Sequence, residues 1–472
     1  MQITLTIQSE IQNYLEQHKL NMSQFAVKAG LNAGTVSGIV MSNRAISVHQ
    51  LDCVTKAMEK PEDYFYSRYV QEYMLEASLD WRRVKAFLQR CTELNRLDCI
   101  AQVVSVLMDN VAYYVPLVFE LAEEFFDQKF YKAAEILYEN VASGERNQHS
   151  ERLALSQYRL FTIRIGDDQK KNLRNATLFE AFVERLDEIL QLDALKDLAN
   201  VYRSLREWDE VEEAAKKMKS KAKIQYSMKH QAMDKKQVGS FNKLSRPLFV
   251  YITYADLLCA SVYEARGDYQ QALQFTYAYS NLEWIKETDE DTVHWKNLFY
   301  HWAEANIIVN KLLSGDIDAL YDYVKYIDTS SGTTDQDMIT QLLNIMVTAN
   351  RYQIDVDDIL KRFETITDSF VKQLTSDIYI KQVIPEQFVR LSYELAYYHL
   401  NRGAYTYGFK YLMYALEKYH TMNDEAYFIK CMVLFERFRS NAMLETKEKY
   451  LKFIERVWMD DVKKDDDINH RS

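Results

Sequence analysis

Glycine and proline are scarce in this chain, which has only 11 Gly and 4 Pro among 472 residues. Average proteins hold the two together at roughly 12%, and strand-rich folds need a turn signal about every 8–12 residues. So few turn residues argue against a sandwich, a barrel or an alternating βα array. Because 48% of the residues are hydrophobic, there is ample material for a core. We expect an all-α protein with several domains or a solenoid.

Charge and cysteine content narrow the function classes. The 58 basic and 69 acidic residues give a net charge of −11, which excludes general coating of nucleic acid but allows a local DNA-reading face. The cysteines are odd in number and form no CxxC, as expected for reduced thiols in a cytosolic protein. We find no signal peptide and no run of about 18 apolar residues. These features predict a cytoplasmic protein without membrane contact.

The N-terminal block, 1–66, differs in composition and residue pattern from the rest of the chain. Ser23 is a candidate cap for a helix over 23–29, and Gly30 supplies the positive φ that ends it. Asn32 caps a second helix over 33–41, and Ser47 begins a third over 47–59. The apolar spacing predicts one face buried against a helix over 9–19. That face comprises Phe25, Ala26, Ala29, Leu31, Val36, Ile39 and Val40.

This pattern of caps, Gly30 and Thr35-Val-Ser-Gly-Ile resembles the phage-repressor or Xre-type helix-turn-helix. In that family the second helix of the pair enters the major groove. The resemblance implies that base edges face Asn32, Ala33, Gly34, Thr35, Ser37 and Gly38. It also implies that phosphates face Gln24, Ser42, Asn43 and Arg44.

The reading helix departs from the family pattern, because Ala33, Gly34 and Gly38 stand where members usually carry Arg, Gln or Lys. We therefore expect few direct contacts to base edges, so sequence recognition should depend partly on DNA shape. Two interpretations stay open: a dimer that binds a two-part site, or a structural block without DNA binding. A basic cluster follows the block and either touches flanking phosphates or is solvated; it comprises Arg82, Arg83, Lys85 and Arg90.

A hairpin motif recurs further along the chain, at 262–273 and 398–409, with weaker copies at 125–134, 205–211 and 315–320. Gly267 and Gly403 permit tight turns, while Ala272 and Gly408 allow close helix approach. The motif resembles degenerate tetratricopeptide (TPR) repeats over 116–440, which implies a right-handed α-solenoid; the alternative is a generic helical bundle. Prolines predict helix breaks near 116 and 385.

A TPR groove is lined by the first helix of each pair, where an Asn amide can clamp a peptide backbone. The candidates, each with an ordinary polar role as alternative, are Asn200, Tyr202, Arg203, Asn297, Tyr300, Asn306 and Asn310. The C-terminal helices carry apolar residues that either form a dimer surface or cap the solenoid. These residues are Phe435, Phe438, Leu444, Tyr450, Phe453, Ile454 and Trp458.

Catalytic and metal signatures are missing from the sequence, which has no GxxxxGK[ST], GxGxxG, GxSxG or HExxH. His294 and His301 lie seven residues apart and lack a nearby third ligand. We therefore expect no catalytic residues, metal or cofactor. Residues 214–236 hold eight lysines against one acid, which is typical either of a solvated face or of a basic helix near an acidic partner.

An Xre-type reader joined to a TPR array resembles the Rap/Rgg/NprR/PlcR/PrgX family of peptide-pheromone receptors. The segment 61–75 and the helices expected over 81–115 are similar to the branch that contains the phage arbitrium receptors. The resemblance implies a homodimeric transcription regulator that binds a double-stranded DNA operator and is controlled by a short imported signalling oligopeptide, as in quorum sensing. Its implied regions are a reader (1–66), linker helices (67–115), a peptide-binding superhelix (116–440) and a C-terminal cap or dimerisation region (441–472). The alternative is an adaptor that sequesters a partner protein; an enzyme has the least support.

Overall fold

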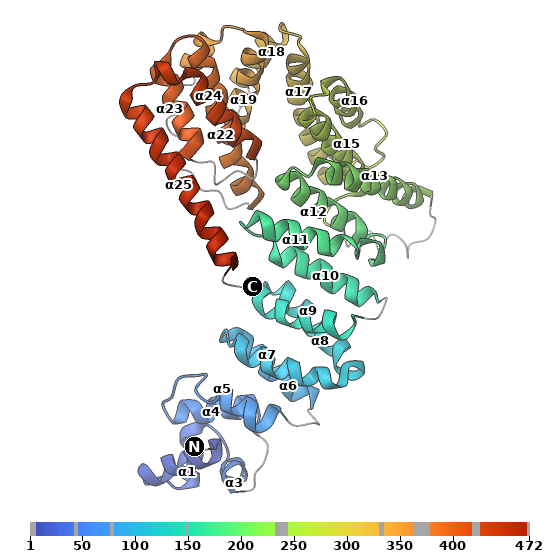
Figure 1. Ribbon diagram of the computed structural model, residues 1–472. Coiled ribbons are helices and arrows are strands. Elements are labelled where there is room, and N and C mark those ends of the chain that lie inside the picture. The colour runs from blue at the N-terminus through green and yellow to red at the C-terminus, as the bar shows by residue number, and fades with distance from the viewer. Residues whose placement is uncertain are drawn as a thin grey trace. The chain divides into compact units, whose positions relative to one another are not determined.

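The computed structural model describes residues 6–41, 46–75, 80–146, 150–231, 244–329, 335–362, 378–417 and 425–469. In 329, 335–337, 378–386, 425–426 and 458–469 it describes the backbone alone. Every regular element in these ranges is a helix (Figure 1), so the expected all-α class is confirmed. The chain divides into two compact units. Unit 1 holds Met1–Arg164 with Phe182–Leu186, and unit 2 holds Ile165–Ala181 with Asp187–Ser472.

Unit 1 is built on one continuous hydrophobic core that reaches from Ile7 to Leu160. The four N-terminal helices share this core with the helices that follow them, and α6 packs directly on α4 of the predicted reader. The helices of unit 1 are α1 (Ile7–Gln17), α2 (Met22–Ala29), α3 (Ala33–Met41), α4 (Val48–Ala57), α5 (Tyr66–Tyr69), α6 (Trp81–Glu93), α7 (Leu97–Leu107), α8 (Val111–Asp127), α9 (Tyr131–Gly144) and α10 (Glu151–Arg164).

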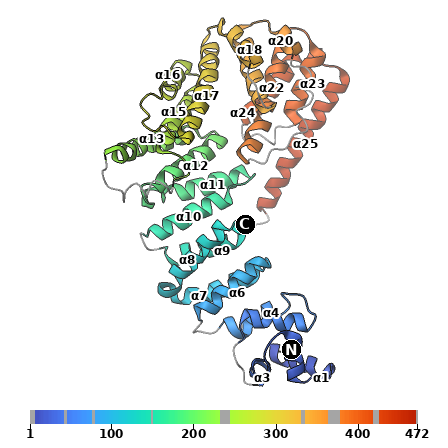
Figure 2. The ribbon, with the colours of Figure 1, turned by 180° about the vertical axis from the view of Figure 1, so that it is seen from behind.

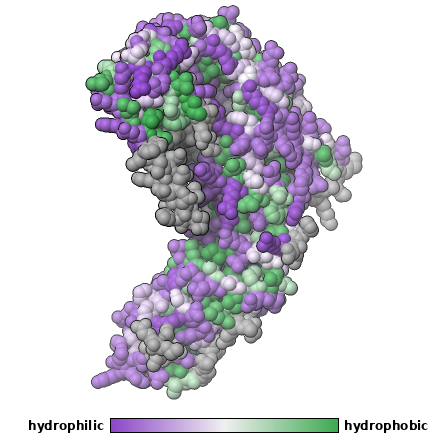
Figure 3. Space-filling view, in the orientation of Figure 1, coloured by the Kyte–Doolittle hydropathy of each residue, from purple (hydrophilic) through white to green (hydrophobic). Residues whose placement is uncertain are grey.

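Unit 2 is a succession of paired helices that follow an arc from α12 to α25 (Figure 2). Helices α12, α15, α17, α19, α22 and α24 lie on its inner side, whereas α13, α16, α23 and α25 lie on its outer side. Their bounds are α11 (Gln169–Glu180), α12 (Leu190–Leu205), α13 (Trp208–Gln231), α15 (Leu248–Ala265), α16 (Tyr269–Ser280), α17 (Glu290–Ser314), α18 (Ala319–Thr329), α19 (Asp335–Tyr352), α20 (Asp357–Arg362), α22 (Ile378–Asn401), α23 (Tyr405–Glu417), α24 (Glu425–Phe438) and α25 (Leu444–Asn469). In the view of Figure 3 the surface of unit 2 is mostly hydrophilic.

All five predicted hairpin turns are present, each between two helices in contact. Gly267 and Gly403 both have a φ of +79°, and Gly315 has a φ of +107°, the left-handed region in which glycine carries no Cβ penalty. Gly408 allows the predicted close approach, since a Cβ there would lie 2.6 Å from Cγ of Leu400. Ala272 is fully buried, as expected for the same role.

Two predicted helix breaks are wrong, because Pro116 lies inside α8 and Pro385 lies inside α22. Each proline removes only one backbone hydrogen bond, and the remaining bonds continue the helix on both sides. The predicted functional boundaries at 66, 115 and 440 stay predictions; the packing of the chain divides it instead near residue 164.

The predicted dimer surface is wrong for three of its residues, which lie in the core of the last repeats. Phe435, Tyr450 and Phe453 are at most 3% exposed, and the rings of Phe435 and Tyr450 stack with centroids 3.7 Å apart. Phe438 and Ile454 pack partly buried against the same core. These side chains pack inside the helices at the end of unit 2, and the alternative that they cap a solenoid stays a prediction. Of the other two, Leu444 is 73% exposed and the side chain of Trp458 lies outside the described residues.

Two described helical stretches are long and apolar enough to cross a membrane, by length and composition only: Leu97–Asp127 and Leu248–Ala265. Neither stretch is an uninterrupted apolar run, since acidic residues such as Asp109 and Asp256 interrupt them. A 3-10 turn at Met108–Asn110 divides the first stretch, and the second is mostly buried within unit 2. Buried core helices of soluble proteins have this composition, so both stretches are compatible with a soluble protein.

Candidate functional site

Helix α2 begins with a capping box rather than at the predicted cap Ser23. The Gln24 amide donates to Oδ1 of Asn21 at 2.9 Å, and the Asn21 amide donates to Oε1 of Gln24 at 3.0 Å. Two orphan donors of the helix start are satisfied in this way. The carbonyl oxygen of the Gln24 side chain is thereby occupied, and its NH₂ remains as a donor toward a phosphate.

The turn between α2 and α3 forms as predicted. Gly30 has a φ of +65°, and its amide closes the end of α2. Asn32 then caps α3, because the Thr35 amide donates to Oδ1 of Asn32 at 2.6 Å. The core-facing residues Val36 and Ile39 are each 1% exposed. Among the core residues predicted for this block, Phe25, Ala26 and Ala29 are also buried, whereas Leu31 and Val40 are half-buried.

The start of α3 presents its predicted base-facing residues outward. Asn32, Ala33 and Gly34 are exposed, and Thr35, Ser37 and Gly38 are half-buried. The polar groups left for base edges are the NH₂ of Asn32 and the hydroxyls of Thr35 and Ser37. No residue from Ala33 to Met41 is charged. The predicted phosphate contacts Asn43 and Arg44, and Ser42 beside them, lie outside the described residues.

Gly34 has no conformational or packing reason to be glycine within this chain. It is not among the residues with positive φ, and a Cβ placed on it would meet only Oδ1 of Asn32, at 3.6 Å. Alanine would fit here and favour the helix. A glycine that the fold does not require leaves room for another molecule to approach the backbone.

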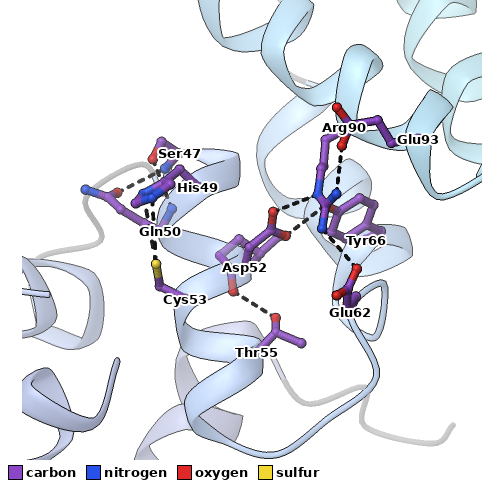
Figure 4. A network of polar contacts seen from close by, with 11 residues as sticks. Ser47, His49, Gln50, Asp52, Cys53, Thr55, Glu62, Tyr66, Arg90 and Glu93 are labelled. Carbon is purple, nitrogen blue, oxygen red and sulfur yellow. Dashed lines mark hydrogen bonds and ion pairs between the residues drawn. The ribbon is translucent and has the colours of Figure 1, made fainter. Parts of the chain in front are cut away.

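The basic cluster after the block is largely engaged inside unit 1. Arg90 donates to Asp52 at 3.0 Å, to Glu62 at 3.0 Å and to Glu93 at 2.7 Å; Figure 4 shows this guanidinium reaching from α6 to α4. Tyr66 completes the network with a 2.8 Å bond to Asp52, and burial raises the pKa of its phenol.

The neighbours of Arg90 are engaged in the same way. Arg83 donates to the Ile46 carbonyl at 3.1 Å, and Lys85 pairs with Glu124 at 2.7 Å. Arg82 is exposed. The Arg83 contact and the Arg90 network hold the α1–α4 block on α6, whereas Lys85 joins α6 to α8. Of the four basic residues, Lys85 and Arg90 are neutralised by carboxylates.

The predicted peptide-binding residues fall into different environments. Tyr202 is 2% exposed and donates to Glu180 at 2.8 Å, and Asn310 is fully buried with no partner for its amide group among the described residues. A clamp made by Asn306 and Asn310 is therefore wrong for this structure, and so is a pocket lined by Tyr202. Asn306 instead donates to the hydroxyl of Tyr279 at 2.7 Å.

The other candidates lie closer to solvent. Asn297 and Tyr300 are exposed on α17, the latter at 45%. Asn200 is half-buried and accepts a hydrogen bond from Tyr254 at 2.6 Å; Arg203, one turn further along α12, is also half-buried.

Two carboxylates of the inner helices did not emerge from sequence reasoning. Glu264 on α15 has a pKa raised by burial and opposed by the charge of Arg203. Glu394 on α22 also has a pKa raised by burial, while Asn350 donates to its Oε2 at 2.7 Å. Each acid thus has a polar or cationic partner on another inner helix. No sequence motif marks them, because the pairing is between helices far apart in the chain.

Within the described part of the chain, no group of three or more His, Cys, Asp or Glu residues is placed to hold a metal ion. His301 faces the hydroxyl of Tyr326, with Nε2 and the oxygen 3.2 Å apart.

No protein-family model matches this sequence, and no curated protein matches it. Residue roles therefore rest on the geometry above and on the resemblance of the motifs.

Proposed function

We propose that this protein is a cytoplasmic transcription regulator that binds double-stranded DNA as a homodimer through the start of α3. The observation that carries the proposal is Gly34, a glycine on an outward-facing helix start that neither φ nor packing requires. In a helix-turn-helix reader the N-terminal residues of this helix contact the base edges. With no charge on α3, one copy would bind weakly, so two copies on a two-part site are needed.

The inner side of unit 2 is, in this proposal, the receptor for a short imported oligopeptide. Exposed Asn297 and half-buried Arg203 and Glu264 lie on inner helices. They supply an amide and both signs of charge, which suit a peptide backbone and its termini. The peptide shifts DNA binding by its difference in affinity for two states of the dimer.

Selection of DNA sites from a random duplex library, followed by fluorescence anisotropy, tests DNA binding directly. Gly34→Asp should weaken site-specific binding at least about tenfold, since a carboxylate at this position repels the phosphates. An acid in the first helical turn favours the helix, so the variant should fold. Asn13→Asp, at an exposed position of α1, changes the net charge equally and should bind as the parent does.

If no sequence is enriched, with or without peptide, DNA binding is refuted. Equal weakening by both variants would also refute readout through α3.

The second candidate is an adaptor that holds a partner protein in unit 2 and has an inert N-terminal block. The charge-free α3 and the engaged Arg83, Lys85 and Arg90 favour it. An adaptor predicts that combined Asn32→Ala and Thr35→Ala leaves cellular function unchanged, whereas the DNA-binding regulator predicts its loss.

A further inference from the structure

A cavity of about 430 Å³ lies in unit 2 among α13, α15, α16 and the loop from Asn281 to Asp289. It uses the outer helices α13 and α16 and includes none of the seven residues predicted to bind peptide. Helix α13 has 24 residues and α16 has 12. The hairpin partner of α13 is α12, which has 16 residues, and the loop contacts the C-terminal half of α13 through Tyr226 and Lys229.

The loop is fixed in place, so the cavity is preformed. Leu282 and Ile285 are buried, at 0% and 7% exposed. Glu287 accepts hydrogen bonds from the hydroxyl of Tyr226 and from Nζ of Lys229, both at 2.8 Å. The Lys286 amide also donates to the Tyr226 hydroxyl, at 3.0 Å. These contacts tie the loop backbone to α13.

Trp284 forms an apolar wall of the cavity and remains accessible. Its flanking anchors are buried, yet Trp284 itself is 38% exposed. Its ring meets Tyr226 edge to face, with centroids 5.2 Å apart. Ile252, 5% exposed, also lines the cavity. A large aromatic side chain held open beside a cavity offers area for an apolar ligand group.

The charges that line the cavity favour an anion. Asp256, whose side chain is 6% exposed, is paired with Lys219. Lys223 lies one turn beyond Lys219 on α13, is exposed, and has no ion-pair partner among the described residues. Among the described residues no other charged side chain lines the cavity, and the nearby Glu287 is held by Lys229 and Tyr226. The lining therefore carries one positive charge in excess.

We propose that this cavity binds a small organic anion, with an aromatic or branched aliphatic group against Trp284 and a carboxylate at Lys223. The volume falls within the range of about 300–1,000 Å³ typical of small-molecule sites. The ligand is either a free carboxylic acid or the C-terminal residue of a peptide, which share this chemistry. The site does not depend on the proposed DNA binding.

Isothermal titration calorimetry of the full chain tests the site with four probes. These are 3-phenylpropionate, 3-phenylpropanamide, N-acetylglycyl-phenylalanine, and the same dipeptide as its C-terminal amide. Each acid should bind about tenfold more tightly than its amide, because only the acid forms a charge-assisted contact. If the natural ligand is a free carboxylic acid, phenylpropionate should bind more tightly than the dipeptide acid. If the ligand is the C-terminus of a peptide, the dipeptide acid should bind more tightly.

Two variants locate the binding. Lys223→Gln should weaken binding of the acids about tenfold and leave the amides unchanged. Lys217→Gln is the matched control, since Lys217 lies on the same helix outside the cavity and pairs with Glu213 at 2.6 Å. Thermal unfolding checks that both variants fold like the parent. The proposal is overturned if neither acid binds at millimolar concentration, if the amides bind as tightly as the acids, or if both variants weaken binding equally.

Discussion

Gly30 and Gly34 lie four residues apart, and the structure gives them different roles. Gly30 has a φ of +65°, so its lack of a side chain is required by the turn. Gly34 has a helical backbone and open space where a Cβ would stand. The fold therefore requires a glycine at position 30 but not at position 34. Alanine variants at the two positions should accordingly differ in stability.

Gly34→Ala should stabilise the protein by about 0.5 kcal/mol, because alanine loses less backbone entropy in a helix than glycine does. The same change should weaken DNA binding, because in this chain, unlike in members that carry Arg, Gln or Lys here, the proposed contact is made by the backbone itself. Urea unfolding measures the change in stability, and fluorescence anisotropy measures the change in DNA affinity. Gly30→Ala should instead destabilise by about 1 kcal/mol, as a left-handed residue acquires a Cβ. Unchanged DNA affinity of Gly34→Ala would remove the main support for the proposed reader.

At the scale of elements, the sequence predicted the helices and turns well. Residues that act locally carried these predictions: Gly30 and Asn32 at the first turn, and Gly267 and Gly403 at later ones. The cap of α2 was assigned to Ser23, although the sequence also carries a local signal for the cap that forms, Asn21. Gln24 follows Asn21 by three residues, as a capping box requires.

Which inner-helix side chains reach solvent could not be predicted. In a helical array, an inner helix contacts its own partner and the neighbouring pairs, so apolar residues surround most of it and periodicity no longer marks one face. Tyr202 and Asn310 were predicted to line a groove and are buried for this reason. The pairing of Glu394 with Asn350 likewise depends on contacts between α19 and α22, which no local pattern encodes.

Helices α22 and α23 approach each other closely at Gly408. A Cβ there would lie 2.6 Å from Cγ and 3.1 Å from the backbone nitrogen of Leu400. Gly408→Ala should destabilise the protein by about 1–3 kcal/mol, because the two helices must separate. Gly166→Ala is the control, since a Cβ at Gly166 meets nothing within 4 Å. If urea unfolding shows equal stability for the two variants, Gly408 does not limit the packing.

Helices α13 and α15 are joined by Glu212, whose side chain is 12% exposed. Hydrogen bonds from Lys216, and then from Arg266 and Tyr263, lower the pKa of Glu212 to about 2. A lowered folded-state pKa stabilises the fold above the unfolded pKa of about 4.3, and this stabilisation is lost as the pH falls toward 2. Glu212→Gln should therefore cost about 1–3 kcal/mol at pH 7 and progressively less below about pH 4.3.

Urea unfolding of parent and variant across this pH range measures the difference. Glu213→Gln is the matched control, because Glu213 also pairs with the lysine four residues on but is 62% exposed. Its effect should stay below about 0.5 kcal/mol at every pH. A deficit of Glu212→Gln that does not change with pH would mean that the glutamate acts through packing rather than through its charge.

At the scale of the whole molecule, the proposed DNA reader and peptide receptor lie in different compact units, each with its own internal packing. No peptide-binding candidate belongs to unit 1, and no DNA-binding candidate belongs to unit 2. If the peptide controls DNA binding, the two units must therefore be coupled, and the strength of this coupling is a free energy. Such a coupling is reciprocal: the factor by which peptide changes DNA affinity equals the factor by which DNA changes peptide affinity.

This reciprocity gives a prediction that needs no assumption about whether the peptide activates or releases DNA binding. By the family resemblance, the peptide is sought among synthetic peptides covering the short reading frame just downstream of the gene. Its dissociation constant should change by a factor of about 5–150 when a saturating selected duplex is present, and the DNA dissociation constant should change by the same factor. Gly34→Asp should bind peptide as the parent does without DNA and lose the effect of the duplex. A peptide that binds with the same affinity in the presence and absence of DNA would show that the two units are uncoupled, which contradicts a peptide-controlled regulator and favours the adaptor.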